Sequence, residues 1–203
     1  MEKEQWMAED FKKCVDFHGH LCGGLVMGYK ASKAALEWFR ENRAQDEELV
    51  AIVENDACGV DAVQVLTGCT FGKGNFIYKD YGKIAFTFFC RKTGKGIRIS
   101  PKFRPGTGME DVQKQLFEKQ RKDTATKEEL SQLEGLKRQK AFELLEKPTD
   151  ELFLITLVRT PIPEKAEIHP SIQCSCCGEP AMATKMETMN GKPVCRGCLD
   201  RRH

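Results

Sequence analysis

The stretch Phe17-His18-Gly19-His20-Leu21-Cys22-Gly23-Gly24 is the one around which this chain is organised. It places two of the four histidines of the chain within four positions of a cysteine. The glycines let the backbone turn tightly and approach a ligand closely. A helical pattern begins at Leu25, so Cys22 should lie at a helix N-terminus, where free N–H groups and the helix dipole favour a thiolate. Cys22 is therefore a candidate metal ligand or nucleophile, although histidines in such a turn can also be simply solvated.

The residues that follow predict a core helix and a buried strand. From Leu25 to about Asn42 the apolar residues recur at steps of three and four, the period of an amphipathic helix. Small residues along this helix indicate that another backbone packs closely against it: Gly28, Ala31 and Ala35. The β-branched apolar run 49–53 is typical of a buried strand. It leads the chain directly to Cys58.

A second polar segment begins at Cys58. If residues 59–66 form a short helix, then Cys58, Asp61 and Gln64 share one face of it. We expect this face to meet the corner formed by His18, His20 and Cys22 and to close one pocket. The hypothesis joins two segments that lie far apart in the sequence.

The next part of the chain is predicted to be a glycine-rich loop and three strands. The loop over residues 68–75 lacks the glycine spacing and the Ser or Thr of a phosphate-binding P-loop, and we expect Lys73 to point into the pocket instead. The apolar runs 76–78, 84–90 and 97–99 predict strands. Because the turns between them are short, an antiparallel meander follows.

Two charged helices and a last strand complete the larger region. The helices are expected from Met109 to about Gln120 and from Thr126, which opens a capping box, to Glu146. The narrow apolar stripe of the second helix suits a solvated helix or one that packs on a second subunit. A strand follows over residues 152–158, and two nearby prolines then indicate a semi-rigid linker. We therefore predict a core domain over residues 1–160 and a linker with a small module over residues 161–203.

Composition narrows the function classes. Lysine and arginine number 32 against 30 aspartates and glutamates, so no overall basic field points to nucleic acid. The chain has no apolar run long enough for a membrane span and no signal peptide, which predicts a cytoplasmic protein without a membrane partner. In a reducing compartment, ten cysteines indicate metal and thiol chemistry rather than disulfides.

The C-terminal cysteines carry the strongest motif in the chain. Two CxxC pairs, separated by seventeen residues, match the spacing of a structural four-cysteine zinc site: Cys174, Cys177, Cys195 and Cys198. Gly178 permits a tight knuckle after the first pair, and Asn190-Gly191 predicts a hairpin turn. A knuckle, a hairpin and a CxxC that opens a helix are the order of a treble-clef finger. We expect the segment to depend on zinc for its fold and to contact protein rather than DNA.

Three segments together resemble one known family. They are the Phe-His-Gly-His-x-Cys corner, the run Glu-Asn-Asp-Ala-Cys58-x2-Asp61-Ala-Val-Gln64-x2-Thr67-Gly68-Cys69-Thr70-x-Gly72-Lys73-Gly74-Asn75, and the terminal four-cysteine module. This combination is similar to the FmdE family of formylmethanofuran dehydrogenase components, over nearly the whole chain. The family is named for a molybdenum or tungsten enzyme that fixes carbon dioxide onto methanofuran in methanogens. The resemblance thus implies association with, or descent from, a methanogenesis-related system.

The resemblance also implies a fold and a site. The fold is an α+β core in helix-strand-helix-three-strand order, similar to the C-terminal domain of glyceraldehyde-3-phosphate dehydrogenase, with a zinc finger appended and a homodimer as the assembly. The motif match implies a pocket for a small ligand or a metal that is lined by His18, His20, Cys22 and Cys58, and more loosely by Asp61, Gln64, Thr67 and Lys73. Imidazole and thiolate together suit zinc or another borderline transition metal.

Three functions remain open at this point. The first is a metal-binding accessory protein for a molybdenum, tungsten or related redox enzyme. The second is an enzyme in its own right, with Cys22 or Cys58 as nucleophile, or an open metal site that activates water, and Asp61 or a histidine as base. The third is a nucleic-acid-binding regulator that uses the finger. A second metal that is lost on substitution of Cys58 would separate the first two from the third.

Overall fold

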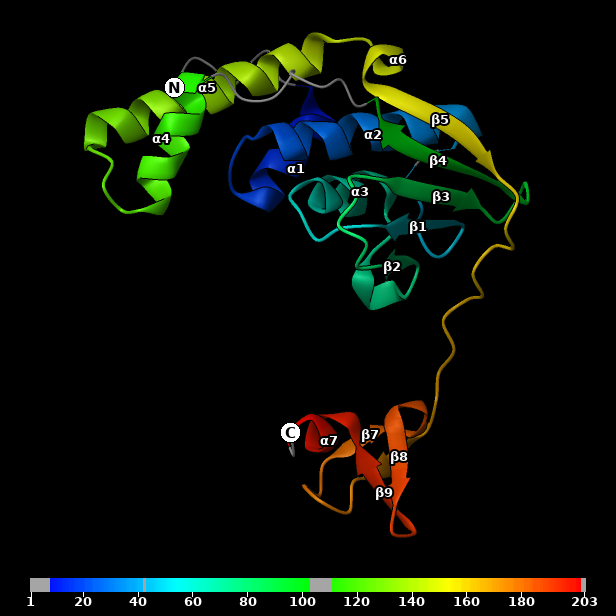
Figure 1. Cartoon of the computed structure of the whole chain (residues 1–203). Helices are drawn as coiled ribbons and strands as arrows, with labels where there is room; N and C mark the ends of the chain where they lie inside the picture. The colour runs from blue at the N-terminus through cyan, green and yellow to red at the C-terminus, as the bar shows by residue number, and fades with distance from the viewer. Residues whose placement is uncertain (1–7, 42, 103–110, 202–203) are drawn as a thin grey trace. The chain divides into compact units, whose positions relative to one another are not determined.

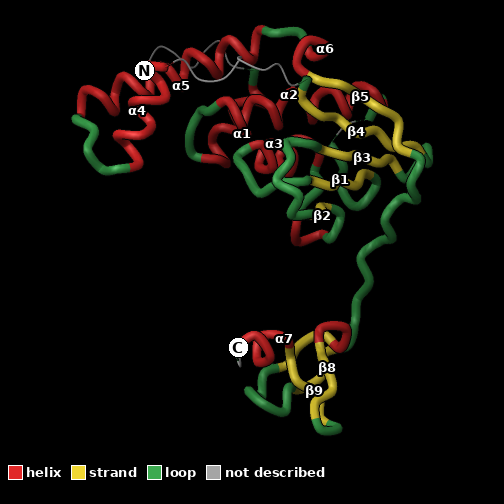
Figure 2. The backbone as a smooth tube through the Cα atoms, in the orientation of Figure 1, coloured by secondary structure: helices red, strands yellow, loops and turns green. Residues whose placement is uncertain are grey.

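The structure is a computed structural model that describes residues 8–41, 43–102 and 111–201. The chain divides into two compact units, Met1–Lys165 and Ala166–His203, each of which is described by itself. The segment 159–170 between the last strand of the first unit and the first strand of the second contains no helix or strand (Figure 2). Within the described residues, no helix combines the length and the apolar character needed to cross a membrane.

A five-stranded mixed sheet forms the centre of the first unit. Its strands are β1 (Leu49–Val53), β2 (Phe76–Tyr78), β3 (Phe86–Cys90), β4 (Lys95–Pro101) and β5 (Phe153–Val158). They lie in the order β2-β1-β3-β4-β5, which Figure 1 shows from bottom to top. β1 is parallel to β2, and the other neighbours are antiparallel.

The predicted three-strand meander is wrong for its first strand. β2 pairs with β1, with Ile77 opposite Ile52, and β1 therefore separates β2 from β3. The segment after β2 also forms backbone hydrogen bonds with the end of β1 and the residue that follows it. The N–H of Lys79 donates to the Val53 carbonyl at 2.9 Å, and the N–H of Lys83 donates to the Glu54 carbonyl at 2.9 Å. Being an almost wholly buried apolar strand, β1 gains a hydrogen-bonded neighbour on each side in this arrangement. Only β3 and β4 keep the predicted antiparallel pairing.

Helices cover one face of this sheet in two layers. α2 (Gly23–Phe39) and α3 (Gly59–Thr67) form the inner layer, in which alternate residues of β3, Phe86 and Phe88, pack with Ala31 and Ala35 of α2 in one buried cluster. An outer cluster joins α1 (Glu9–His18) and α5 (Lys127–Glu146) to the inner helices through Phe11, Cys14, Leu25, Leu66 and Ala141. The sequence reasoning did not predict α1, whose residues are mostly polar.

The helices α4 (Asp111–Arg121) and α5 form a hairpin that precedes α6 (Thr149–Leu152) and β5 (Figure 1). The predicted capping box is confirmed, because the Thr126 hydroxyl accepts from the Glu129 N–H and the Glu129 carboxylate accepts from the Thr126 N–H. Two contacts hold these helices together. Lys119 forms an ion pair with Glu129, and the Lys137 ammonium lies 4.4 Å from the centre of the Phe117 ring. Met109 and Asn42, two predicted helix ends, lie outside the described residues.

The second unit is built from two short hairpins and a helix. Its elements are β6 (Ser171–Gln173), β7 (Pro180–Met182), the 3-10 turn η2 (Ala183–Lys185), β8 (Met186–Met189), β9 (Lys192–Cys195) and α7 (Arg196–Asp200). The predicted hairpin at Asn190-Gly191 is confirmed, and both residues have positive φ, 48° and 74°. That is the backbone of a type I′ turn.

Candidate metal centre

Two segments that lie far apart in the sequence meet at one point in the first unit. His18, His20 and Cys22 come from the corner between α1 and α2, and Cys58 comes from the start of α3. Each offers one nitrogen or sulfur atom, and all four atoms lie within 4.8 Å of one another. The predicted convergence of the corner with the Cys58 segment is therefore confirmed.

Glycines make this convergence possible by letting α2 and α3 pack backbone to backbone. A Cβ atom added at Gly28 would lie 2.0 Å from the carbonyl oxygen of Gly59, and one at Gly24 would lie 3.3 Å from the Cβ of Cys58. No side chain fits at the first of these contacts. The small residues of α2 thus bring the N-termini of two helices, each preceded by a cysteine, side by side.

Local backbone geometry sets the corner itself. α1 ends at His18 and is capped by Gly19, whose φ of 86° is left-handed and favours glycine. Cys22 is the extended residue before α2, and its Sγ accepts a hydrogen bond from the Leu25 N–H at 3.4 Å. The prediction that Cys22 occupies a helix N-terminus is confirmed.

Asp61 positions the imidazole of His18. Oδ2 of Asp61 lies 2.6 Å from Nδ1 of His18, and Nε2 on the other side of the ring faces Sγ of Cys22 at 3.9 Å. A carboxylate that holds the outer nitrogen of a metal-ligating histidine fixes its tautomer and makes it a stronger ligand. Asp61 therefore acts through His18, and the inner nitrogen is directed towards the sulfur atoms.

The sulfur atoms also favour a bound cation. Burial raises the pKa of the Cys58 thiol, and the neighbouring Cys22 thiol raises it further. The pair therefore resists holding two thiolates unless a positive charge lies between them. Two imidazoles and two thiols are a donor set that suits zinc or another borderline divalent ion. The residues at this site fit such an ion.

Three residues predicted to line the pocket lie elsewhere. Oε1 of Gln64 accepts from the Phe71 N–H at 3.2 Å, beside the 3-10 turn η1 (Phe71–Lys73). Thr67 is buried and bonds within its own helix end. The Lys73 ammonium donates to the Asp46 carbonyl at 2.9 Å, on the loop before β1. These groups satisfy backbone polar atoms that the fold would otherwise leave unpaired.

A cavity of about 890 Å³ opens in front of the cluster. One wall is the corner with Cys22, His20 and Cys58, and the other is the α4–α5 hairpin. The hairpin side chains include Gln113, Phe117, Glu134, Lys137, Arg138 and Lys140. Sequence reasoning missed this wall, because the charged face of α5 is typical of a solvated surface.

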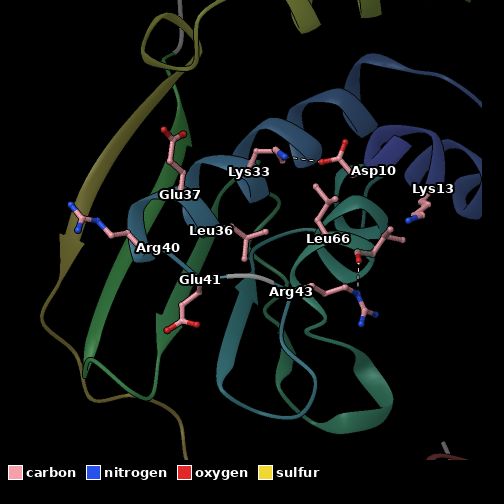
Figure 3. Close-up of a pocket in the computed structure, with 10 residues that line it drawn as sticks. Asp10, Lys13, Lys33, Leu36, Glu37, Arg40, Glu41, Arg43 and Leu66 are labelled. Atoms are coloured by element: carbon pink, nitrogen blue, oxygen red, sulfur yellow. Dashed lines mark hydrogen bonds and ion pairs between the residues drawn. The ribbon is translucent and has the colours of Figure 1, made fainter. Parts of the chain in front are cut away.

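A second cavity, of about 660 Å³, lies beside α1 and α2 and has a different chemistry (Figure 3). The Lys33 ammonium donates to Asp10 at 2.7 Å, and Nε of Arg43 donates to the Val65 carbonyl at 2.8 Å (Figure 3). None of the described residues that line it is a histidine or a cysteine. Its lining offers one internal ion pair, Lys33 with Asp10, and no imidazole or thiol among the described residues, so the candidate metal site is the His/Cys cluster.

The second unit contains a separate four-cysteine cluster. Cys174, Cys177, Cys195 and Cys198 have sulfur atoms within 4.8 Å of one another, with 4.0 Å from Cys174 to Cys198 and 3.9 Å from Cys177 to Cys195. A tetrahedron around zinc has sulfur–sulfur edges of about 3.8 Å, since each zinc–sulfur bond is about 2.3 Å. Backbone N–H groups of Cys177, Cys195 and Cys176 lower the pKa of Cys174 to about 6. The cluster fits a four-thiolate metal site.

One family model and two known proteins are similar to this chain. The family model described as "FmdE, Molybdenum formylmethanofuran dehydrogenase operon" matches residues 17–154, from the corner to β5. A curated protein of Archaeoglobus fulgidus named "Probable S-adenosyl-L-methionine-binding protein" is 34% identical over an alignment of 188 positions, and the match covers 86% of this chain and 49% of that protein. The chain thus spans about half the length of that relative.

A solved structure is similar along most of the chain. It is an FmdE-like protein from Syntrophus aciditrophicus, named for tungsten formylmethanofuran dehydrogenase, with a TM-score of 0.61 and 22% sequence identity. The match covers 94% of this chain and 90% of the other. The likeness establishes a shared mixed α+β fold.

Proposed function

This chain belongs to the FmdE family, and on that basis we propose that it is a metal-binding accessory protein for a molybdenum- or tungsten-type redox enzyme. Metal delivery or subunit assembly would be its task. The observation that carries the proposal is the convergence of His18, His20, Cys22 and Cys58 on one point, backed by Asp61. Zinc, or another borderline divalent transition metal, is the proposed ion.

The proposed role of the second unit is structural. Four thiolates leave a metal ion no open position, so zinc there would hold the fold and take no part in chemistry. The order of knuckle, hairpin and helix supports a treble-clef finger. The likeness of the core to the C-terminal domain of glyceraldehyde-3-phosphate dehydrogenase stays a prediction from the family resemblance.

Metal analysis tests the core site directly. We expect two metal ions per chain in the natural sequence and one in Cys58→Ser, measured by mass spectrometry of the purified protein. Cys14→Ala is the matched control, because Cys14 is buried in α1 and lies outside both clusters. Equal metal content in the natural chain and Cys58→Ser would contradict the proposed core site.

The proposed partner follows from the family name alone. Affinity purification of the tagged chain from its native host, with proteomic identification, should recover subunits of a molybdenum or tungsten enzyme. Cys58→Ser would lose metal but keep that association if the metal serves delivery, and would lose both if the metal serves assembly. Recovery of no such subunit would contradict the accessory role.

We also propose that the chain forms a homodimer through its open sheet edge. β5 is the last strand of the sheet and exposes apolar side chains along it, with Leu154 53% and Leu157 69% exposed. An open apolar edge strand invites pairing with another strand. Leu157→Lys should give a monomer in sedimentation velocity, whereas Ile84→Lys, an exposed apolar residue outside β5, should not. A dimer that survives Leu157→Lys would count against this edge.

A second candidate function comes from the Archaeoglobus fulgidus relative. That protein is named for S-adenosyl-L-methionine binding, and the sequence match with it covers 86% of this chain. Binding of this compound in front of Cys22 and Cys58 would favour an enzyme, with Cys22 and Cys58 as its proposed catalytic residues and with Asp61, which does not line the cavity, as a residue that positions His18. Calorimetric titration of the metal-loaded chain with S-adenosyl-L-methionine tests this candidate function. Saturable heat of binding would support it, and the absence of such heat would contradict it.

A further inference from the structure

The α4–α5 hairpin presents a positively charged wall opposite the candidate metal centre. Three cationic side chains on this wall line the cavity, Lys137, Arg138 and Lys140, against a single carboxylate, Glu134. Lys140 pairs with Glu143 at 3.2 Å, whereas neither Lys137 nor Arg138 forms an ion pair within the described part of the chain. Two cations thus face the cavity without a carboxylate partner.

Aromatic rings hold both cations in place. The Lys137 ammonium lies 4.4 Å from the centre of the Phe117 ring and 3.4 Å from Oε1 of Gln120, and its side chain is half-buried. The Arg138 guanidinium lies 5.6 Å from the centre of the Phe142 ring. Cation–π contacts restrict the cations without neutralising them. Their donors therefore remain able to bind an anion.

Apolar side chains in the same cavity indicate that the ligand also has an apolar part. Leu21, Phe117 and Leu130 line it, and Leu130 is 39% exposed. A volume of about 890 Å³ accommodates a small organic molecule and is within the usual range of such sites. One side of the molecule would meet rings and aliphatic groups, and another would meet the two cations.

We propose that this cavity binds a small organic anion with an aromatic or apolar body, held between the basic wall of α5 and the His/Cys cluster. His20, the exposed member of the cluster, and the two cysteines line the inner end, whereas His18 lies behind them against Asp61. This inference depends on the proposed metal centre in one respect, the placement of the inner end of the ligand beside it. The anion selectivity rests on the hairpin alone.

Binding of 8-anilino-1-naphthalenesulfonate to the full-length, metal-loaded chain tests this inference by fluorescence. The double variant Lys137→Gln/Arg138→Gln should weaken binding about tenfold, since charge-assisted hydrogen bonds are lost. Glu134→Gln should strengthen binding, which an unfolded variant would not do. The matched control is Arg121→Gln/Lys127→Gln, which removes two charges from the same hairpin outside the cavity.

The neutral analogue N-phenyl-1-naphthylamine separates charge recognition from apolar contact. Its affinity should be the same in the natural chain and in both double variants. Equal sulfonate affinity in the cavity variant and the matched control would overturn the inference. Metal content is measured on every sample. If the chain holds no core metal but its affinity for the sulfonate still depends on Lys137 and Arg138, only the proposed metal centre is overturned. If the chain holds the core metal but its affinity for the sulfonate does not depend on these two charges, only this inference is overturned.

Discussion

The carboxylate of Asp61 lies 2.6 Å from Nδ1 of His18, which joins the first turn of α3 to the last turn of α1. The two residues are 43 positions apart in the sequence. Through this contact one helix sets the direction of an imidazole carried by another. The direction of this candidate metal ligand therefore depends on a residue outside the cluster of His18, His20, Cys22 and Cys58.

Replacing this carboxylate should loosen the metal without unfolding the core. Asp61→Asn keeps the shape but removes the charge that strengthens His18, so we expect the core site to lose about tenfold in metal affinity. Competition with a coloured chelator measures it. Asp16→Asn, which removes an exposed carboxylate on the same helix α1, should leave the affinity unchanged. Equal affinities in both variants would show that Asp61 does not support the ligand.

The contact of α2 with α3 should not tolerate a methyl group. In Gly28→Ala the new Cβ would lie 2.0 Å from a backbone oxygen, so we expect a loss of about 3 kcal/mol in the free energy of unfolding, together with a weaker core metal site. Gly135→Ala, also within a helix but with open space around it, should instead gain up to about 1 kcal/mol. Urea unfolding compares the two. A neutral Gly28→Ala would mean that the helices can separate freely.

The ion pair between Glu54 and Arg98 should give the first unit an acid-sensitive contribution to stability. Arg98 donates to both carboxylate oxygens, at 2.9 and 3.0 Å, and holds the pKa of Glu54 below its usual value. The carboxylate side chain is only 9% exposed. A lowered pKa stabilises the fold fully above the unfolded-state pKa of about 4.3, and this stabilisation is lost as the pH falls through the folded-state pKa.

Glu54→Gln should therefore be destabilised by about 2 kcal/mol at neutral pH, and the difference from the natural chain should shrink below about pH 4. Thermal unfolding over a pH series measures this. Glu118→Gln removes an exposed partner of Lys122 and should change stability little at any pH. A difference that is constant with pH would contradict the assigned charge pair.

Removing metal from the second unit should unfold that unit alone. Its buried apolar residues among those described are Cys174, Val194 and Cys198, too few to stabilise a fold without the binding free energy of about 10 to 16 kcal/mol that zinc supplies. A strong chelator, or Cys195→Ser, should make residues 166–203 sensitive to trypsin while the first unit stays resistant. Cys176→Ser, outside the cluster, should remain resistant with metal bound. Resistance after complete metal removal would contradict this dependence.

Much of the local structure could be predicted because its signals act over a few residues. Cys22 before α2, Thr126 before α5 and the Asn190-Gly191 turn satisfy or bend the backbone beside them, so neighbouring residues suffice to identify them. The two CxxC pairs are equally local, since each pair presents two thiols from a single turn. A short, β-branched apolar run likewise identified the buried strand β1.

The tertiary structure decided what depends on pairing between distant segments. β1 lies between β2 and β3, because a central buried strand forms hydrogen bonds on both sides. No short stretch of sequence reveals this order of strands. In the same packing, Lys73 and Gln64 form hydrogen bonds with backbone atoms outside the site, and Asp61 contacts His18. It also placed the charged hairpin of α4 and α5 opposite the cysteines. The sequence by itself thus determined which residues could bind metal, whereas close packing at Gly28 and Gly59 decided which of them meet.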